Sequence, residues 1–224
     1  MKVILALVVL LMTIFTFSAF AAEPEAKDHT PTAFKDLSID QIDLLLCYHL
    51  LGRSIMMYNT DYDQENSDSR HNITITSFLL GINLDPDPKT IKTSKECIVA
   101  ILMWDKQIQK KIDTSIDPIG CNNYFVMGEL VGNIITPLSV INRDSKKGTP
   151  DPKMKALISR NLTSIRTVAE INQIPADLLQ TLKSIETAYL KTKTNREGFD
   201  LAMKLFKWSD DLLDRLSKKK KTEK

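Results

Sequence analysis

Cysteine and histidine are the residues of this chain that could bind a transition metal, and Cys47 and His49 stand two positions apart. Two ligands on one face of a helix need a spacing of three or four residues. At a spacing of two, the side chains diverge by about 200° around the helix axis. His29 and His71 fall in segments that we expect to be a leader and a loop. The sequence therefore predicts no metal site.

An acidic segment offers a second kind of chemistry. Asp61, Asp63 and Glu65 occupy the first, third and fifth positions of a calcium-binding loop. The sixth position of such a loop requires Gly and the twelfth Glu, but Asn66 and Asn72 stand there. The pattern favours a solvated acidic loop, with weak calcium binding as the alternative.

Carboxylates provide the remaining candidates for catalysis. Asp210, Asp211 and Asp214 lie close together, and helical spacing puts two of them on one face. Such a pair could perform acid–base catalysis, although a solvated face is the simpler interpretation. A site assembled from distant positions would combine Glu129 with Asp105 or with Asp210. A cleft that gathers two such groups with perturbed pKa values would favour an enzyme.

The short motifs of known nucleophiles and phosphate-binding loops are missing. The sequence contains no Gly-x-Ser-x-Gly, no His-Glu-x-x-His and no glycine-rich phosphate loop. We therefore predict no catalytic and no cofactor-binding residue, and we favour a non-enzymatic protein.

The three cysteines, Cys47, Cys97 and Cys121, can form at most one internal disulfide. Cys47 and Cys97 each lie about nine residues into a predicted helix. An up-down-up arrangement makes those helices parallel and puts these two cysteines at similar height, whereas Cys121 lies near a turn. Cys47–Cys97 is thus the expected pair if a disulfide forms. Three buried thiols that pack as small apolar groups are the alternative.

The N-terminus has the features of a secretory signal peptide. Lys2 precedes an apolar run from Val3 to Phe17, and the small residues Ala19 and Ala21 follow. Cleavage is expected between Ala21 and Ala22, and the alternative is an uncleaved membrane anchor. Either form places the rest of the chain outside the cytoplasm, in the periplasm or secreted.

The remaining sequence is organised as helices. Residues 22–36 read as a flexible leader, and a capping box of Ser38 with Gln41 begins a helix that should run to about residue 59. A polar loop follows at 60–72. A shorter helix is expected at about 74–84, where the alternation of Ile73 and Ile75 leaves a strand as the alternative.

Three Asp-Pro dipeptides should each open a helix, because Asp caps free amide groups and Pro fits the first helical position. They are Asp87-Pro88, Asp117-Pro118 and Asp151-Pro152. Pro137 should bend or end the second of these helices. Two more helices are expected at 175–192 and 196–217.

These elements predict an all-α fold, an up-and-down bundle of about seven helices that spans 37–217. It could consist of two helical-hairpin units. Residues 142–150 form the candidate hinge, and residues 218–224 a basic tail.

Charge argues against nucleic acid as a partner, because 30 Lys and Arg balance 28 Asp and Glu. Lys218, Lys219, Lys220 and Lys221 could make a weak contact with an anionic surface. No apolar stretch after the signal peptide is expected to span a membrane, because Glu129 interrupts the best candidate.

Two further patterns bear on packing and modification. Gly128 and Gly132 would let another backbone approach closely, within the bundle or between copies of the chain. Asn72 and Asn161 begin Asn-x-Thr sequences that can be glycosylated only in a eukaryotic source, and the sequence leaves the source open.

The order of the helices resembles the N-terminal sensor-like module of type IV pilus methyl-accepting chemotaxis transducers. The resemblance covers Asp87 to Ile141, with Trp104 in mid-helix, and Pro175 to Leu216. The distinctive opening motif of that family is absent. The resemblance implies a sensing role.

We therefore expect an exported helical bundle that binds an unknown protein or small molecule between its helices, without a cofactor. The alternatives are a secreted effector or envelope interaction protein, and an enzyme with a carboxylate-based site.

Overall fold

The computed structural model describes residues 30–62, 64 and 67–222, and over these residues the chain is helical with no strand. This confirms the all-α prediction. The predicted signal peptide and most of the leader lie outside the described residues. The elements are the 3-10 turns η1 (Phe34–Asp36) and η2 (Pro88–Thr90) and the helices α2 (Ile39–Tyr58), α3 (Asp68–Leu79), α4 (Ser94–Ile112), α5 (Pro118–Asp144), α6 (Pro152–Ile171), α7 (Ala176–Leu190) and α8 (Asn195–Thr222).

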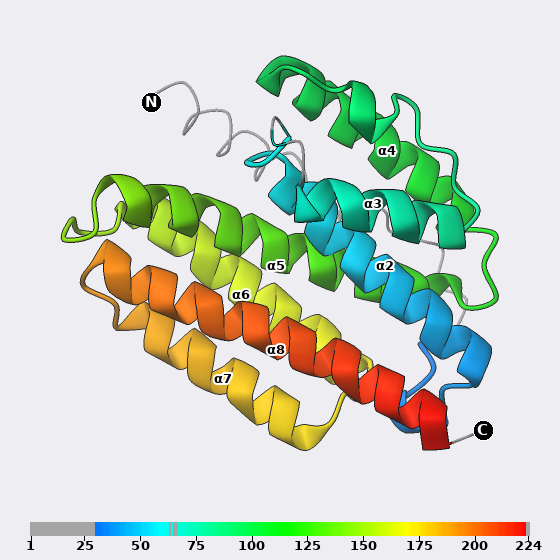
Figure 1. Ribbon diagram of the computed structural model, residues 1–224. Helices are drawn as coiled ribbons and strands as arrows, with labels where there is room; N and C mark the ends of the chain where they lie inside the picture. Colours follow the sequence, from blue (N-terminus) through cyan, green and yellow to red (C-terminus); the bar gives the residue numbers. More distant parts are fainter. Residues whose placement is uncertain (1–29, 63, 65–66, 223–224) are drawn as a thin grey trace.

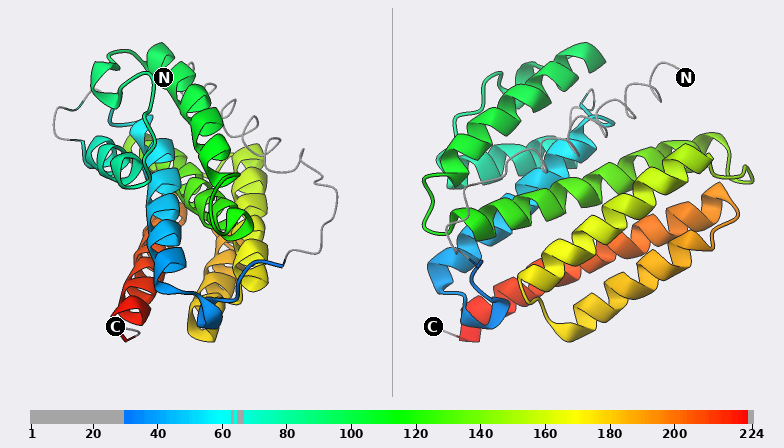
Figure 2. Two further views of the ribbon diagram at one scale, coloured as in Figure 1. Left: turned by 90° about the vertical axis from the view of Figure 1, so that its right-hand side faces the viewer. Right: turned by 180° about the vertical axis from the view of Figure 1, so that it is seen from behind.

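Helix α5 is the centre of the bundle and packs against α2, α8 and α6 (Figure 1). Helices α6, α7 and α8 lie along one side of α5, whereas α3 covers α2 and α4 forms the outer edge (Figures 1 and 2). Helix α5 is long and apolar enough to cross a membrane, contrary to expectation, but 78% of its apolar window is buried inside the protein.

Helices α2 and α5 touch through their backbones. A Cβ on Gly132 would lie 2.7 Å from the Arg53 carbonyl oxygen, and one on Gly128 would lie 2.9 Å from the Arg53 amide nitrogen. Gly52 approaches α5 in the same way and would lie 3.1 Å from the Glu129 nitrogen. Gly128 and Gly132 therefore allow close packing within the chain, between α2 and α5. Gly52, on α2, lies in the same contact.

Side-chain caps begin α2, α5 and α6 where the sequence predicts, whereas α4 begins elsewhere. Asp117 and Asp151 accept hydrogen bonds from the first turns of α5 and α6. Asp87 opens only the turn η2, because Thr93 and Glu96 form a capping box that starts α4 afresh. The expected single helix from Asp87 is therefore wrong.

Three element boundaries also differ from prediction. The polar loop ends early, because Ser67 caps α3 at Asp68, and residues 73–75 are helical. Pro137 does not end α5, which continues to Asp144, and the alternative of a bend at Pro137 stays a prediction. The basic tail is not a frayed end, since α8 runs through Lys218–Lys221 to Thr222.

The segment between α5 and α6, which overlaps the candidate hinge at 142–150, is bonded to the start of α8. The backbone N–H of Asn195 donates to the Gly148 carbonyl oxygen over 2.8 Å. The side-chain amide of Asn195 donates to the Ser145 carbonyl oxygen over 2.8 Å. The Arg196 amide also donates to the Lys146 carbonyl oxygen. These bonds tie the segment to the α7–α8 hairpin.

Candidate functional site: a buried polar junction

A chain of hydrogen bonds joins α2 to α8 in the interior. The Ser209 hydroxyl lies 2.7 Å from Nε2 of His49, and Arg53 donates to the same hydroxyl oxygen over 3.0 Å. Arg53 also forms an ion pair with Asp210 at 2.6 Å. Because Arg53 can only donate, the Ser209 proton is left to point at His49.

The other nitrogen of His49 fixes its tautomer. Nδ1 lies 3.2 Å from the Tyr124 carbonyl oxygen, to which it donates, so Nε2 accepts from Ser209. Burial, together with the Arg53 charge, lowers the pKa of His49 to about 3. His49 is thus a neutral, fully bonded core residue at ordinary pH.

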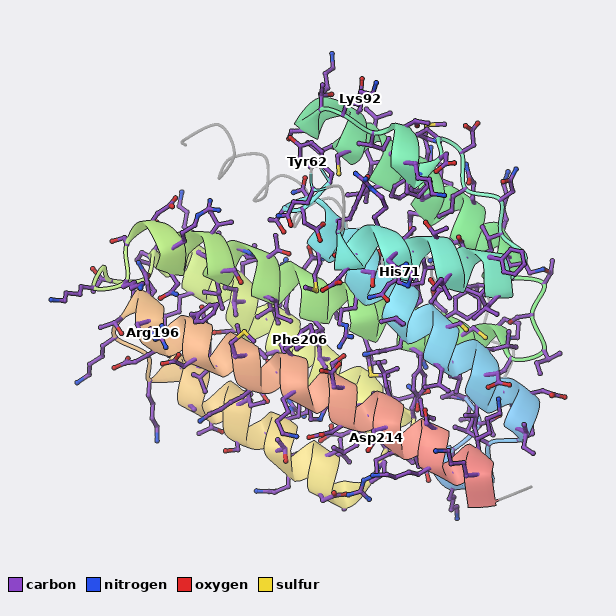
Figure 3. The ribbon with its side chains drawn as sticks, in the orientation of Figure 1. Tyr62, His71, Lys92, Arg196, Phe206 and Asp214 are labelled. Atoms are coloured by element: carbon purple, nitrogen blue, oxygen red, sulfur yellow. The ribbon has the colours of Figure 1, made fainter. Side chains whose placement is uncertain are left out.

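A serine hydroxyl bonded to a histidine has the arrangement of a nucleophile with its base. Ser209 is 0% exposed, however, and its oxygen is already engaged by Arg53. The guanidinium group also lies 4.5 Å from the Phe206 ring, which α8 contributes to the junction (Figure 3). The junction therefore holds α8 on α2 and presents no reactive atom to a substrate.

Glu129 lies in the α2–α5 contact and has a different environment. Its residue is 8% exposed, and the Oε1 atom is buried without a hydrogen-bond partner. Burial, reinforced by the Asp105 charge, raises the pKa of Glu129 well above its usual value. The pKa of Asp105 on α4 is also raised by burial.

Two carboxylate pairs were considered from the sequence, Glu129 with Asp105 and Glu129 with Asp210. In the structure the Asp105 charge contributes to the raised pKa of Glu129. Asp210 instead pairs with Arg53. Asp211 and Asp214 form ion pairs with Lys207 and Lys218 on the surface of α8, as expected for a solvated face (Figure 3).

The cysteines are free thiols in the structure. Burial raises the pKa of Cys97 to about 12, and the nearby Asp61 charge adds to this, so Cys97 lies by the C-terminal end of α2. Cys47 lies 11 residues before Tyr58, roughly 16 Å along the same helix. The prediction that Cys47 and Cys97 lie at similar height is therefore wrong. Helix α4 begins at Ser94 beside the end of α2, which puts Cys97 near that end and far from Cys47.

Cys121 has a different neighbour. The charge of an ionised Cys121 raises the pKa of Tyr48, which is next to Cys47 in the sequence. Cys121 therefore lies beside the first half of α2. Burial raises the pKa of Cys121 itself to about 11, which leaves the thiol protonated and unreactive.

Three other sequence candidates concern metal binding and glycosylation. No group of three or more His, Cys, Asp or Glu could hold a metal ion among the residues that the structure describes. The acidic loop lies partly outside those residues, so calcium binding stays a prediction. Asn161 is 1% exposed, which prevents glycosylation of the folded chain.

Two surface hollows lie away from these polar groups. One, of about 440 Å³, lies between the end of α7 and the start of α8 and is lined by residues that include Thr192, Glu197 and Lys204. The other, of about 450 Å³, lies where Phe34 and Pro175 meet the end of α8. Neither includes Glu129, Asp105 or Ser209.

Comparison with protein-family models, with curated proteins and with solved structures gives no match to this chain. The resemblance to the chemotaxis-transducer module stays a prediction.

Sequence reasoning missed the junction itself. His49 and Ser209 are 160 positions apart, and neither belongs to a recognisable motif. The signal that could have indicated it was Arg53 within an apolar helical stretch, because a buried guanidinium requires partners.

Proposed function

We propose that this chain is an exported, non-enzymatic binding or sensing module whose ligand is held by Glu129 with Asp105, where α4 approaches α2 and α5. The observation that supports this is the buried Glu129 Oε1 without a hydrogen-bond partner. Buried polar atoms in folded proteins are nearly always satisfied, so an exception marks a place where a ligand, ion or proton belongs.

The chemistry of the pair defines the class of ligand. Two acidic groups, both with raised pKa values, repel each other when ionised. A ligand with an ammonium group would donate to Oε1 and relieve that repulsion, since charge-assisted hydrogen bonds are the stronger kind. A small organic amine therefore fits the pair.

The backbone contact explains why Glu129 remains buried. The Glu129 Cγ atom would lie 3.2 Å from a Cβ on Gly52, so the absence of a side chain there makes room for it. A ligand at Glu129 would thus change the packing of α2 against α5. A sensing module could use that change as its response to the ligand.

Thermal unfolding with amine probes tests the proposal. We expect ethylamine, ethanolamine, putrescine or spermidine at millimolar concentration to raise the Tm of the purified exported chain at pH 7, by mass action on the folded state. Glu129→Gln should abolish that rise. Asp200→Asn, which removes one negative charge from a half-exposed side chain on α8, should retain it.

Either of two results would contradict the proposal. One is that none of the four amines raises the Tm, and the other is that Glu129→Gln responds as strongly as Asp200→Asn.

A second candidate function rests on the same two side chains. Carboxyl groups with raised pKa values can act as general acids near neutral pH. An enzyme of that kind would need an open cleft at Glu129, and neither surface hollow reaches it. The same closure applies to an amine ligand, so the preference for a binding module rests on the missing catalytic motifs and on the unsatisfied Glu129 Oε1 atom.

A further inference from the structure

The lysines of this chain differ in whether they have an intramolecular partner. On α8, Lys207 pairs with Asp211, Lys218 with Asp214 and Lys220 with Asp43, while Lys219 donates to the Lys35 carbonyl oxygen. The anionic-surface contact expected at Lys218–Lys221 is thus weakened, because Lys218, Lys219 and Lys220 already have intramolecular partners. Lysines elsewhere, among them Lys146, Lys147 and Lys153, have no carboxylate partner within the described residues.

One group of such lysines gathers on α4 and the turn before it. The group is exposed and, over the residues that the structure describes, makes no ion pair with a carboxylate; its members are Lys89, Lys92, Lys95, Lys106, Lys110 and Lys111. The Glu96 carboxylate is occupied by the amide groups of Lys92 and Thr93. Lys92 lies at the outer edge of the molecule (Figure 3).

Exposed apolar side chains lie within this basic group. Val99 is 49% exposed and Met103 is 40% exposed, and they are four positions apart on α4. Lys95, Lys106 and Lys110 continue the same stripe at spacings of three or four residues. The outward face of α4 therefore carries two apolar side chains, with Lys95 before them and Lys106 and Lys110 after them.

The end of α3 adds to this surface. Lys111 Nζ would lie 3.7 Å from a Cβ on Gly81, which follows α3, so the C-terminal ends of α3 and α4 meet (Figure 1). Phe78 and Leu79, near that end, are 81% and 64% exposed. Large apolar groups exposed to this degree mark an interaction site when they cluster.

We propose that α4 is an interfacial helix that docks on an anionic lipid surface. Unpaired lysines supply the attraction to anionic headgroups, and Val99 and Met103 enter the boundary between headgroups and acyl chains. A soluble polyanion would use the lysines but would give these apolar side chains no partner. The proposal concerns the outward face of α4 and is independent of the ligand at Glu129.

Vesicle sedimentation provides the test. The chain is purified after export, with its N-terminus established by mass spectrometry, so that all variants share the same N-terminal segment. Wild-type protein should bind vesicles of equal parts phosphatidylglycerol and phosphatidylcholine and not pure phosphatidylcholine. The variant Lys95→Gln/Lys106→Gln/Lys110→Gln should bind at least about tenfold more weakly.

The matched control removes the same charge from paired lysines. Lys183→Gln/Lys207→Gln/Lys218→Gln lies on α7 and α8, and its affinity should stay within about threefold of wild type because those lysines have acidic partners. Equal losses in the two triple variants would overturn the proposal, since net charge alone would then explain binding.

A charge-neutral variant separates lipid from a soluble polyanion. Val99→Ser/Met103→Ser should weaken vesicle binding about tenfold, because it removes two apolar side chains from the interface, and should leave heparin binding unchanged. Wild-type vesicle affinity in this variant would overturn the proposal in favour of an acidic polymer. Circular dichroism melting confirms that each variant is folded.

Discussion

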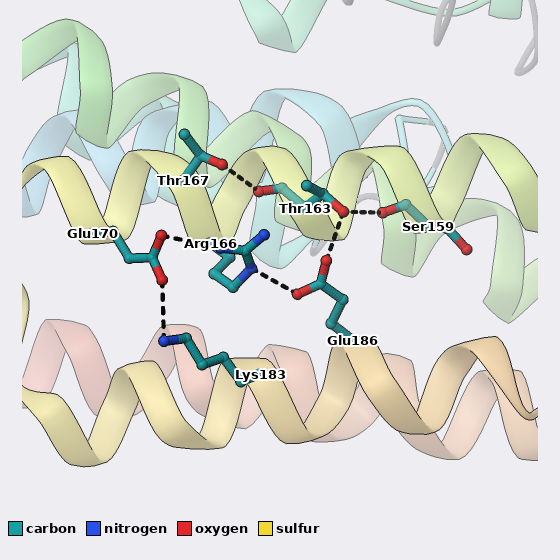
Figure 4. Close-up of polar contacts among 7 residues, drawn as sticks. All are labelled: Ser159, Thr163, Arg166, Thr167, Glu170, Lys183 and Glu186. Carbon is teal, nitrogen blue, oxygen red and sulfur yellow. Dashed lines mark hydrogen bonds and ion pairs between the residues drawn. The ribbon is translucent and has the colours of Figure 1, made fainter.

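The α2–α5 and α6–α7 contacts join helices in opposite ways. Gly52, Gly128 and Gly132 bring the backbones of α2 and α5 together, with buried polar groups on either side. Helices α6 and α7 are joined at the surface by side chains, through a network around Arg166, Glu170 and Glu186 (Figure 4). Lys183 extends this network to Glu170.

The difference shows where the chain tolerates change. A backbone contact has no side chain that can move aside, so any added atom separates the helices. A surface network consists of flexible, hydrated side chains whose loss water compensates. The free energy of unfolding should therefore depend strongly on α2–α5 and weakly on the α6–α7 ion pairs.

The largest effect is expected for Gly128→Ala. The new Cβ would lie 2.9 Å from the Arg53 nitrogen and closer still to the His49 carbonyl oxygen. We expect a loss of about 3 kcal/mol in urea unfolding. Gly198→Ala is the control, because its Cβ would meet only ordinary contacts at 3.5 Å and 3.7 Å. Equal destabilisation of the two variants would refute the special role of the α2–α5 contact.

Arg53→Ala should cost about 2–3 kcal/mol in the free energy of unfolding. It removes the hydrogen bond to Ser209, the ion pair with Asp210 and the contact with Phe206. The side chain of Asp210 is 49% exposed, so water can solvate it and limits the loss. A change below about 0.5 kcal/mol would mean that the junction does not hold α8 in place.

His49 should make stability depend on acid. Its pKa is about 3 in the folded chain against 6.5 when unfolded, so the unfolded state binds the extra proton between these values. Stability from this group is therefore lost as pH falls below 6.5, by about 2 kcal/mol at pH 5. Comparing the unfolding of wild type and His49→Gln at pH 7 and pH 5 measures this loss. The same fall in both would assign it to other groups.

Glu129 should act in the opposite direction. Its pKa is raised by folding, so its contribution is full at low pH and is lost as pH rises through the folded value. Glu129→Gln should stabilise the chain at pH 8 and not at pH 4, because only at the higher pH does the buried carboxyl group carry the cost of ionisation or of staying protonated. Equal effects at the two pH values would show that Glu129 does not titrate within the fold.

The smallest effect is expected at α6–α7. Arg166→Ala removes ion pairs to Glu170 and Glu186 and should cost less than about 1 kcal/mol in urea unfolding. Adding salt should reduce that cost further. A loss as large as that of Gly128→Ala would erase the contrast between the two contacts.

The candidate site was only partly predictable. Glu129 and Asp105 were identifiable as carboxylates on apolar helices, but helical periodicity does not say which faces meet. The capping box of Thr93 and Glu96 was readable in the sequence, yet Asp87-Pro88 offered a competing start for the helix. Cys97 was assigned to the wrong height because α4 begins beside the end of α2, whereas the predicted parallel arrangement puts the starts of the two helices together.

The sequence by itself determined the local structure. The caps at Ser38, Asp117 and Asp151, with apolar residues at helical spacing, define helices through interactions between near neighbours. Only the tertiary structure decided that Gly52 meets α5, that Ser209 bonds His49 and that Glu129 is left without a partner. These contacts join positions far apart in the chain, and they depend on how whole helices pack.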